Sequence, residues 1–311
     1  MRVVLEVADK IKMLEIQGAR NIAIAAIKAI ETMAVQTTAK NKEGFLKELY
    51  AARNILFTSR ATEPLMRNAV RRILARVEES TEDDVKVLRD VVSSAAKQFL
   101  MDFDRSSGLI AEIGAKRVKD KAVIFTHCHS STVTNILKRA KAQGKTFEVI
   151  CTETRPVFQG RITAKELVEA GIKTTLIVDS ATRFFMNEAD MVLVGADAIT
   201  SEGNVINKIG TSAIALIAKE ARTPFYVAAE LLKFDPETMY GDYEEIEERS
   251  PEEIWENPPK ALTIRNPAFD ITRRDFIHGI ICEEGIISPH SIAEVVRRRY
   301  PWVFNSGLPR L

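Results

Sequence analysis

Cysteine is scarce in this chain of 311 residues, and the three that occur, Cys128, Cys151 and Cys282, lie far apart. An odd number at such spacing predicts neither a disulfide framework nor a cysteine-based zinc site, so a reducing compartment is the simplest expectation. Long apolar runs are also missing, because stretches such as residues 22–30 are interrupted by charge well before the roughly 18 residues of a membrane span. The amino terminus lacks a signal-peptide pattern. We expect a soluble, cytoplasmic protein.

An excess of charge of either sign is absent as well. The chain has 44 lysine and arginine residues against 43 aspartate and glutamate residues, a formal net charge of +1, and 46% of its residues are hydrophobic. This balance excludes an intrinsically disordered chain and a strongly basic surface of the kind that coats nucleic acid. At roughly 100 to 200 residues per domain, the length predicts two structural units with a large core.

The hydrophobic periodicity changes near residue 119. Residues 1–119 place apolar side chains at helical spacing, as in Ile22, Ala26 and Ile30, which predicts a helical amino-terminal domain. In residues 120–311, short runs rich in Val and Ile alternate with helical stretches, which is typical of buried parallel strands. The predicted strands are residues 122–126, 147–151, 174–178, 191–194 and 225–228. The sequence thus predicts an α/β fold, a helical domain followed by a Rossmann-like, mainly parallel sheet domain.

Two local signals add detail to the second half. Thr163 and Glu166 have the spacing of a capping box, which predicts a helix over residues 163–170. Residues 236–260 hold many acidic residues and four prolines, and we expect them to form a surface excursion rather than part of the sheet.

Polar residues follow every predicted strand at its carboxyl end. Ligands of open parallel sheets bind at this edge, so these side chains are expected to converge on one cleft. The segments concerned are residues 126–132, 153–155, 159–161, 179–180 and 195–197, with Glu230 and Lys233 after the fifth strand.

Cys128 lies at a predicted strand-to-helix junction within the first of these segments. A free cysteine is most often a small buried apolar residue, and that is one interpretation. At this junction, however, exposed amides and the helix dipole would stabilise a thiolate and lower the thiol pKa below about 8.5, which suits a nucleophile or general base. His127 and His129 flank it; without further ligands at metal-binding spacing, we expect them to hydrogen-bond the loop or tune the thiol.

Other polar residues of this edge predict anion binding and acid–base chemistry. Residues 130–132 combine hydroxyls with the first amides of a helix, an arrangement that can bind phosphate or simply cap the helix. Asn207 and Lys208 are expected to open another helix and to hold the same ligand. Asp197 follows a buried strand directly, and with Cys128 it could form an acid–base couple, although Asp197 could also form a turn and Asp179 a cap. Dinucleotide and P-loop patterns are absent from the sequence.

Several strings, taken together, match a known family. They are THCHSST around Cys128, TETRPVFQGRITAKEL from Thr152, VDSA from Val178, GADAIT from Gly195 and NKIGT from Asn207. From about residue 18 to residue 301, the sequence resembles the family that joins initiation factor 2B α, β and δ subunits with aldose-phosphate isomerases. Catalytic members carry a cysteine and an aspartate at the positions of Cys128 and Asp197, whereas the translation factors generally do not.

The resemblance implies isomerisation of ribose 1,5-bisphosphate to ribulose 1,5-bisphosphate in nucleoside monophosphate degradation, without cofactor or metal. We expect Cys128, as thiolate, to remove the proton from carbon 2 while neutral Asp197 protonates the ring oxygen. The substrate ligands that the resemblance implies are Gly18, Ala19, Arg20, Arg60, Ser130, Ser131, Thr132, Asn207, Lys208 and Lys233. Because they come from both halves of the chain, a cleft between the domains is the expected site.

Two segments depart from the patterns of related enzymes. Residues 18–23 replace the Gly-Ala-Pro-Ala-Ile-Gly motif of methylthioribose-1-phosphate isomerases, and Arg20 suits a second phosphate better than an apolar methylthio group. Residues 59–64 lack the expected Arg-Pro-Thr sequence, and we expect Glu63 to face away from a phosphate at Arg60.

The expected partners are a phosphorylated sugar and further copies of the chain, as a dimer through the sheet domain or a hexamer, with no nucleic acid or membrane. A regulatory subunit that binds initiation factor 2, and an isomerase of another aldose 1-phosphate, are the alternatives.

Overall fold

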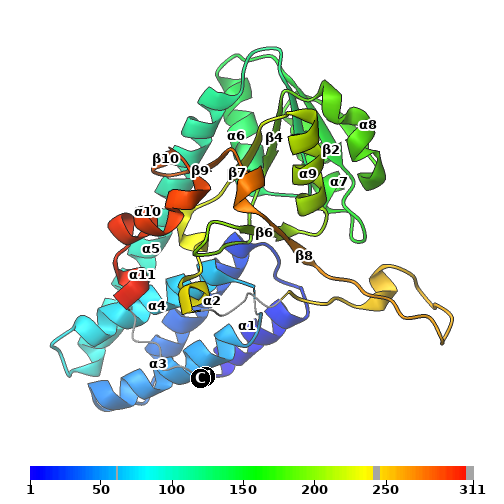
Figure 1. Ribbon diagram of the computed structural model, residues 1–311. Coiled ribbons are helices and arrows are strands. Elements are labelled where there is room, and N and C mark those ends of the chain that lie inside the picture. Colours follow the sequence, from blue (N-terminus) through cyan, green and yellow to red (C-terminus); the bar gives the residue numbers. More distant parts are fainter. Residues whose placement is uncertain (61, 241–245, 306–311) are drawn as a thin grey trace. The chain divides into compact units, whose positions relative to one another are not determined.

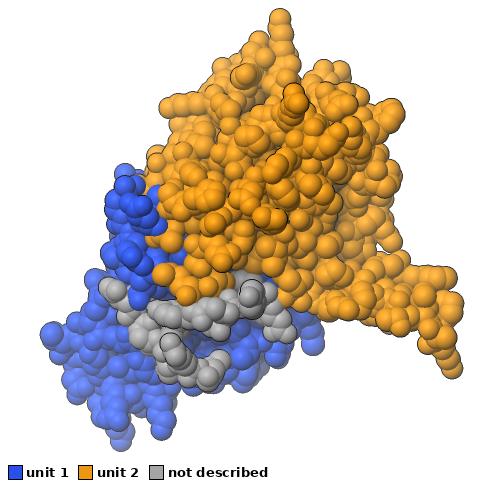
Figure 2. All heavy atoms as spheres, viewed as in Figure 1, with its two compact units in different colours: residues 1–105, 232–236, 294–311 blue, residues 106–231, 237–293 orange. Residues whose placement is uncertain are grey.

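The computed structural model describes residues 1–60, 62–240 and 246–305, which form two compact units. Unit 1 comprises the described parts of residues 1–105, 232–236 and 294–311, and unit 2 those of residues 106–231 and 237–293 (Figure 2). The domain boundary expected after residue 119 stays a prediction, and the two units of the structure are used below. Within the described ranges, no helix combines the length and the apolar character needed to cross a bilayer.

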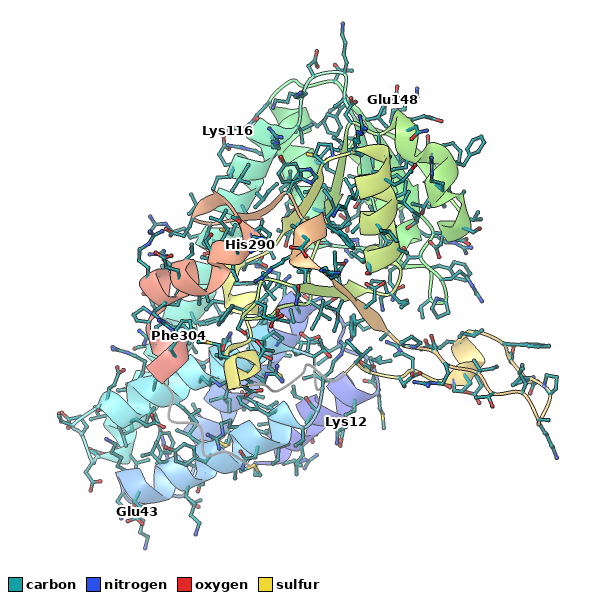
Figure 3. The ribbon with its side chains drawn as sticks, in the orientation of Figure 1. Lys12, Glu43, Lys116, Glu148, His290 and Phe304 are labelled. Carbon is teal, nitrogen blue, oxygen red and sulfur yellow. The ribbon has the colours of Figure 1, made fainter. Side chains whose placement is uncertain are left out.

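Unit 1 is built from helices. They are α1 (Arg2–Lys12), α2 (Ala19–Gln36), α3 (Lys42–Phe57), α4 (Pro64–Glu79), the first part of α5 (Val85–Arg117), most of α10 (Ile292–Arg299) and α11 (Trp302–Asn305). The side chains of Ile22, Ala26 and Ile30 are fully buried along α2, as the helical spacing predicts. Phe304 of α11 packs against Phe234 with ring centroids 5.6 Å apart, which ties residues 232–236 to the carboxyl-terminal helix (Figure 3).

Unit 2 contains a seven-stranded sheet in the order β10-β9-β7-β4-β1-β2-β3 (Figure 1). Its strands are β1 (Val123–Thr126), β2 (Glu148–Thr152), β3 (Lys173–Ile177), β4 (Met191–Val194), β7 (Phe225–Ala228), β9 (Gly279–Cys282) and β10 (Gly285–Ile287). All neighbours pair in parallel except β10, which is antiparallel to β9. All five predicted strands are present within one residue of their expected bounds, so the prediction of a helical domain and a Rossmann-like sheet is confirmed.

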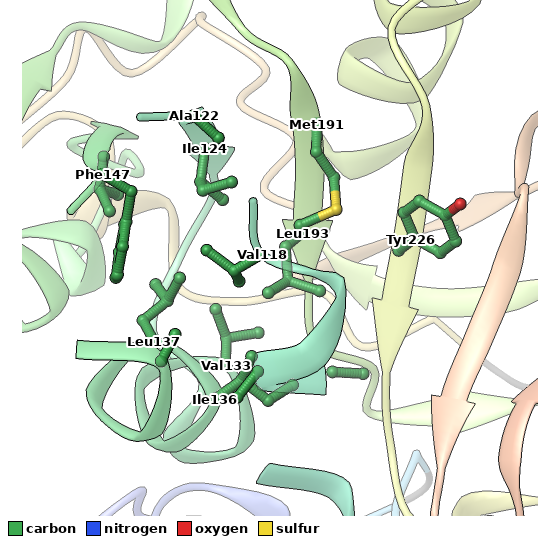
Figure 4. Close-up of a cluster of buried hydrophobic side chains, with 14 of the residues drawn as sticks. Val118, Ala122, Ile124, Val133, Ile136, Leu137, Phe147, Met191, Leu193 and Tyr226 are labelled. Atoms are coloured by element: carbon green, nitrogen blue, oxygen red, sulfur yellow. The ribbon is translucent and has the colours of Figure 1, made fainter. Parts of the chain in front are cut away.

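The sheet of unit 2 packs its apolar side chains against helix α6 (Ser131–Ala142) and the end of α5. Ile124 of β1 and Leu193 of β4 meet Val133, Ile136 and Leu137 of α6 in one cluster, each at most 2% exposed (Figure 4). Burying one such Ile or Leu side chain stabilises a fold by about 1.5–3 kcal/mol. This packing fixes the carboxyl ends of β1 and β4 relative to the start of α6.

A second, three-stranded sheet consists of β5 (Ala198–Ile199), β6 (Val205–Lys208) and β8 (Phe269–Thr272) in antiparallel pairs. Asn207 and Lys208 lie on β6, and helix α9 begins later, at Thr211, and ends at Ala221. The expectation that these two residues open a helix is therefore wrong. They pair with Asp270 and Phe269 of β8, some sixty residues along the chain, so the local sequence carries no sign of the pairing.

The predicted helix over residues 163–170 is α7, which begins earlier than the capping box requires. It spans Gln159–Glu169, with Phe158 as its N-cap residue. Thr163 and Glu166 lie inside the helix, so the capping box is wrong. Gly160, with no side chain, packs against the backbone of Thr152, and this close contact holds the helix start in a position that the cap pattern does not predict.

The later part of the acidic segment forms a surface excursion as expected, whereas residues 236–240 form a short 3-10 helix that begins with the buried Pro236. Of the predicted surface excursion over residues 236–260, residues 246–260 are mostly exposed and belong to an arm that leads into β8 (Figure 1). The arm is closed at its base by a bridge between Glu248 and Pro267. Residues 241–245 lie outside the described residues.

Replacing Gly160 with alanine is expected to destabilise unit 2 by about 3 kcal/mol, in the range of severe overpacking. A Cβ atom there would lie 1.8 Å from the carbonyl oxygen of Thr152, and a backbone atom of a sheet strand cannot swing aside. Urea denaturation measures the change. Gly108→Ala in α5 is the control, because nothing lies within 4 Å of its added methyl group. Equal stability of the two variants would contradict the prediction.

Candidate active site

Cys128 and Asp197 follow two adjacent strands of the main sheet. Cys128 comes two residues after β1, and Asp197 comes three residues after β4. The direction of strand order changes between these strands, since β2 and β3 extend from β1 while β7 and β9 extend from β4. Open α/β sheets bind ligands beyond the carboxyl ends of strands at such a switch point.

The backbone of Cys128 adopts a left-handed conformation with a φ of 65°, which is uncommon for a residue other than glycine. Its N–H donates a hydrogen bond to Thr154 Oγ1 at 2.9 Å, and its carbonyl oxygen accepts one from Thr163 Oγ1 at 2.8 Å. The residue is only 9% exposed. Side-chain hydroxyls from the β2–α7 region therefore bind both backbone groups of Cys128.

Burial raises the pKa of the Cys128 thiol to about 11, despite the opposing Lys208 ammonium and the backbone N–H of His129. The negative charges of Asp197 and Asp179 raise the pKa further. The expectation of a lowered pKa is thus wrong for the ligand-free protein, because loss of hydration outweighs the favourable helix end. Cys128 and Asp197 nevertheless follow the adjacent strands β1 and β4, and the charges of Lys208 and Asp197 both act on the thiol.

Alkylation of Cys128 by iodoacetamide is expected to accelerate about tenfold for each pH unit between pH 7 and pH 10, because the thiolate is the reactive form. With a pKa of about 11, roughly one thiol in a thousand is ionised at pH 8. Peptide mass spectrometry follows Cys128 separately from the other cysteines. A rate that levels off below pH 9 would show that the thiol is more acidic than its burial implies.

The two flanking histidines bind the loops of the site. His127 Nε2 donates to the carbonyl oxygen of Ile209 at 2.9 Å, and Nδ1 accepts from Thr152 Oγ1 at 2.6 Å. Burial lowers the pKa of His127 and of His129. A neutral His127 with both nitrogens bonded links the end of β1 to β2 and to the segment that precedes α9.

Asp179 holds the loop after β2 instead of capping only its own short helix. Its carboxylate accepts the backbone N–H groups of Thr154 at 2.8 Å and of Arg155 at 2.6 Å. Thr154 has a φ of 63°, so this loop too has a left-handed residue held by hydrogen bonds. The same Thr154 then accepts from Cys128 N–H.

The start of α6 offers hydroxyls at the same edge. Ser130 is its N-cap residue and accepts from the Val133 amide at 3.4 Å, while Ser131 is exposed. Thr132 is buried and donates to Glu230 Oε1 at 3.4 Å. Gly195 approaches closely, since a Cβ there would lie 2.6 Å from Ser130 Oγ. The ends of β1 and β4 therefore meet at Ser130.

The segment from β6 to α9 contributes polar groups and a cation. Asn207 Nδ2 donates to Thr211 Oγ1 at 3.0 Å, and Lys208 Nζ lies 4.9 Å from the centre of the Phe269 ring. Asp270 accepts the Gly210 amide at 2.8 Å and the Ser212 amide at 3.0 Å, and burial raises its pKa to about 6.

The remaining predicted ligands, Gly18, Ala19, Arg20, Arg60 and Lys233, belong to unit 1. Gly18 precedes α2 with a φ of 82°, and Arg20 forms an ion pair with Asp104 while its guanidinium lies 4.7 Å from the centre of the Phe103 ring. Lys233 is buried. The binding role of all these residues, and the cleft between domains, stay predictions.

Glu63 does not face away from Arg60. It is fully buried, and its Oε1 atom lies 3.2 Å from Arg60 Nη1. The expectation was wrong because Arg60 and Glu63 are three residues apart around the start of α4, close enough to pair once both are taken out of water.

Two further residues support the site and were not predicted from the sequence to do so. Thr163 binds the Cys128 carbonyl from inside α7, and Asp270 anchors the start of α9 from β8. Thr163 was assigned to a cap because Glu166 follows at the matching spacing. Nothing local points to Asp270, since its partners are about sixty residues away.

Known proteins resemble this chain in sequence and in fold. Residues 15–289 match the model of the initiation factor 2 subunit family. The chain is 44% identical to ribose 1,5-bisphosphate isomerase of Thermococcus kodakarensis over 98% of this chain and 97% of that protein. Among solved structures, a translation initiation factor eIF-2B of Pyrococcus horikoshii shares 34% identity with a TM-score of 0.80, over 92% of this chain and 97% of that one. The 5-methylthioribose 1-phosphate isomerase of P. horikoshii shares 31% identity with a TM-score of 0.77, over 96% and 87%. The chain therefore belongs to the initiation factor 2 subunit family.

Proposed function

We propose that this protein is an aldose–ketose isomerase that converts ribose 1,5-bisphosphate to ribulose 1,5-bisphosphate, within nucleoside monophosphate degradation. The observation that carries the proposal is the place of Cys128 and Asp197 after two adjacent parallel strands, β1 and β4, at the switch point of the sheet. The likeness to the Thermococcus isomerase over nearly the whole chain supports the choice of substrate.

The substrate explains why two groups are needed. Its anomeric oxygen is esterified, so the ring cannot open to a free aldehyde, and the ring oxygen must be protonated as its bond to carbon 1 breaks. Asp197 supplies that proton while Cys128 removes the proton from carbon 2, which leaves a double bond between carbons 1 and 2. Cys128 then returns its proton to carbon 1, and the hydroxyl on carbon 2 gives its proton to Asp197. The ketose forms and both side chains recover their starting states.

The charges around the thiol agree with Cys128 as the base and Asp197 as the acid. The negative charge of Asp197 raises the Cys128 pKa, so a proton on Asp197 removes a cause of that elevation. A thiolate with a carboxylic acid has the same net charge as a thiol with a carboxylate, and the Lys208 ammonium favours the thiolate. We propose that the working pair is the thiolate and the acid, with Ser130, Ser131, Thr132, Asn207 and Lys208 binding the sugar and one phosphate.

The direct test is incubation of the purified protein with ribose 1,5-bisphosphate and detection of ribulose 1,5-bisphosphate by ³¹P nuclear magnetic resonance. Ribose 5-phosphate and methylthioribose 1-phosphate are the comparison substrates. Faster turnover of another sugar phosphate would show that this other compound is the substrate. If none of the sugar phosphates were turned over, the proposed isomerase activity would be wrong.

The likeness to the Pyrococcus eIF-2B favours a second candidate, a regulatory subunit that binds initiation factor 2. Capture of initiation factor 2 by a protein that shows no isomerase activity would favour this candidate.

We further propose that the protein works in the cytoplasm, where its three free cysteines stay reduced, and assembles as a homo-oligomer, a dimer through the sheet domain or a hexamer. Light scattering on the purified chain measures the assembly. A monomer at assay concentration would contradict it.

A further inference from the structure

The conformation of Cys128 needs an external support. Its φ of 65° is disfavoured because the Cβ atom of an L residue crowds the backbone there. Such conformations persist when the surrounding structure holds them, and they occur frequently at active sites. The two hydroxyls that bind Cys128, Thr154 on its N–H and Thr163 on its carbonyl oxygen, are the support visible in the described residues.

The Thr163 hydroxyl has a fixed direction. It has one proton, which it donates to the Cys128 carbonyl, so it must accept from His129 Nδ1 at 3.1 Å. The far side of the His129 ring faces Glu166, with Nε2 3.7 Å from Oε1, and Glu166 Oε2 in turn binds Lys138 Nζ at 2.8 Å. Thr163 is 1% exposed, so water does not compete for its hydroxyl.

Thr154 is held at both its amide and its hydroxyl. Asp179, which follows β3, accepts the Thr154 amide at 2.8 Å, and Thr152 Oγ1 lies 3.2 Å from Thr154 Oγ1. Both threonines are buried. The Cys128 backbone is thus bound from two directions by side chains of one segment, the β2–α7 region, and each hydroxyl has its own second contact.

We propose that Thr154 and Thr163 are positioning residues for the isomerase reaction, which hold Cys128 in its left-handed conformation after β1 and so fix the place of its thiol. The inference rests on the proposed function for its catalytic consequence. Neither threonine exchanges protons with the substrate, and both act through the Cys128 backbone. The hydrogen bonds between the Thr154 and Thr163 hydroxyls and the Cys128 backbone explain why position 128 can hold a residue other than glycine at a positive φ.

The experiment compares Thr163→Val, which keeps the shape and loses the hydroxyl, with Thr163→Ser, which keeps the hydroxyl. Thr223→Val is the control, because Thr223 is also buried and donates to a backbone carbonyl, that of Ala189, but lies at the start of β7 at the opposite end of the sheet. For each variant, kcat, KM, thermal unfolding and the rate of Cys128 alkylation at one pH are measured.

Thr163→Val is expected to lower kcat by about ten- to a hundredfold with little change in KM, the cost of misplacing a reacting group. The same variant is expected to alkylate Cys128 several times faster, since a released thiol meets more water. Thr163→Ser restores both values, and Thr223→Val changes neither. A Thr163→Val protein with the parent kcat and alkylation rate, or a Thr223→Val protein with the same losses, would overturn the inference.

The alkylation rate is measured without substrate, so the test of the positioning role does not depend on the test of the proposed isomerase activity. If the parent protein fails to turn over ribose 1,5-bisphosphate, the proposed function fails. The positioning role still stands if Thr163→Val alone alters the reactivity of Cys128, and fails if it does not. Thr154→Val is the second test variant, and we expect it too to lower kcat and to speed alkylation of Cys128. A Thr154→Val protein with the parent kcat and alkylation rate would contradict the role of Thr154.

Discussion

Cys128→Ser is expected to lower kcat for ribose 1,5-bisphosphate by about a thousandfold, within the range for loss of a positioned general base. A hydroxyl is a far weaker acid than a thiol, so the variant cannot present an anion to carbon 2 at neutral pH. KM is expected to change little, because the thiol is assigned no part in holding phosphate. Steady-state rates over a range of substrate concentrations separate the two constants.

The control for this change is Cys282→Ser. Cys282 Sγ donates to the carbonyl oxygen of Gly285 at 3.4 Å, and a serine hydroxyl can make the same bond. It is expected to retain the parent kcat. If Cys128→Ser also turned over at nearly the parent rate, Cys128 would not be the base, and another group would have to remove the proton from carbon 2.

Asp197→Asn is expected to cost a similar factor of about a thousand in kcat, because an amide has no acidic proton to give to the ring oxygen as it leaves carbon 1. A second result is expected without substrate. The charge of Asp197 raises the Cys128 pKa, so removing that charge lowers the pKa below about 11 and speeds alkylation of Cys128 at any pH below it. Measuring both separates loss of the acid from collapse of the site.

Asp190→Asn is the matched control. Asp190 lies just before β4, at the end opposite Asp197, and its Oδ2 atom accepts the Val123 amide at 2.8 Å, a bond that an asparagine oxygen can keep. It is expected to leave kcat and the alkylation rate unchanged. Near-normal turnover by Asp197→Asn would remove Asp197 from the mechanism.

The architecture of the main sheet was predictable because its strands are buried on both faces. Runs such as residues 191–194 and 225–228 are continuously apolar, and both form strands with those bounds. The small sheet was not predictable in this way. Residues 205–208 are two apolar residues followed by two polar ones, too short a pattern to predict a strand, and they form β6 by pairing with β5 and β8. Contacts so distant along the chain leave no local pattern.

The candidate site was predictable in composition but not in energetics. Cys128 and Asp197 were found from their places after two strands, and those strands, β1 and β4, are neighbours in the sheet. The direction of the Cys128 pKa shift was missed, because burial depends on every segment that covers the thiol. The pairing of Glu63 with Arg60 and the bond from Thr163 were missed for the same reason: both depend on which side chains are taken out of water together.

Asp270 makes the amino-terminal end of α9 different from that of α6 in the charge that its amides bind. At the start of α9, two amides already bind its carboxylate, so that end carries a built-in counter-anion. At the start of α6, the Val133 amide binds the uncharged hydroxyl of Ser130, and the Glu230 carboxylate is bound by the Thr132 hydroxyl rather than by an amide. The two helix ends therefore differ in which amides a carboxylate already binds. One carboxylate supplied by a distant strand thereby occupies the amides at the start of α9 and leaves those at the start of α6 the more accessible to an anion.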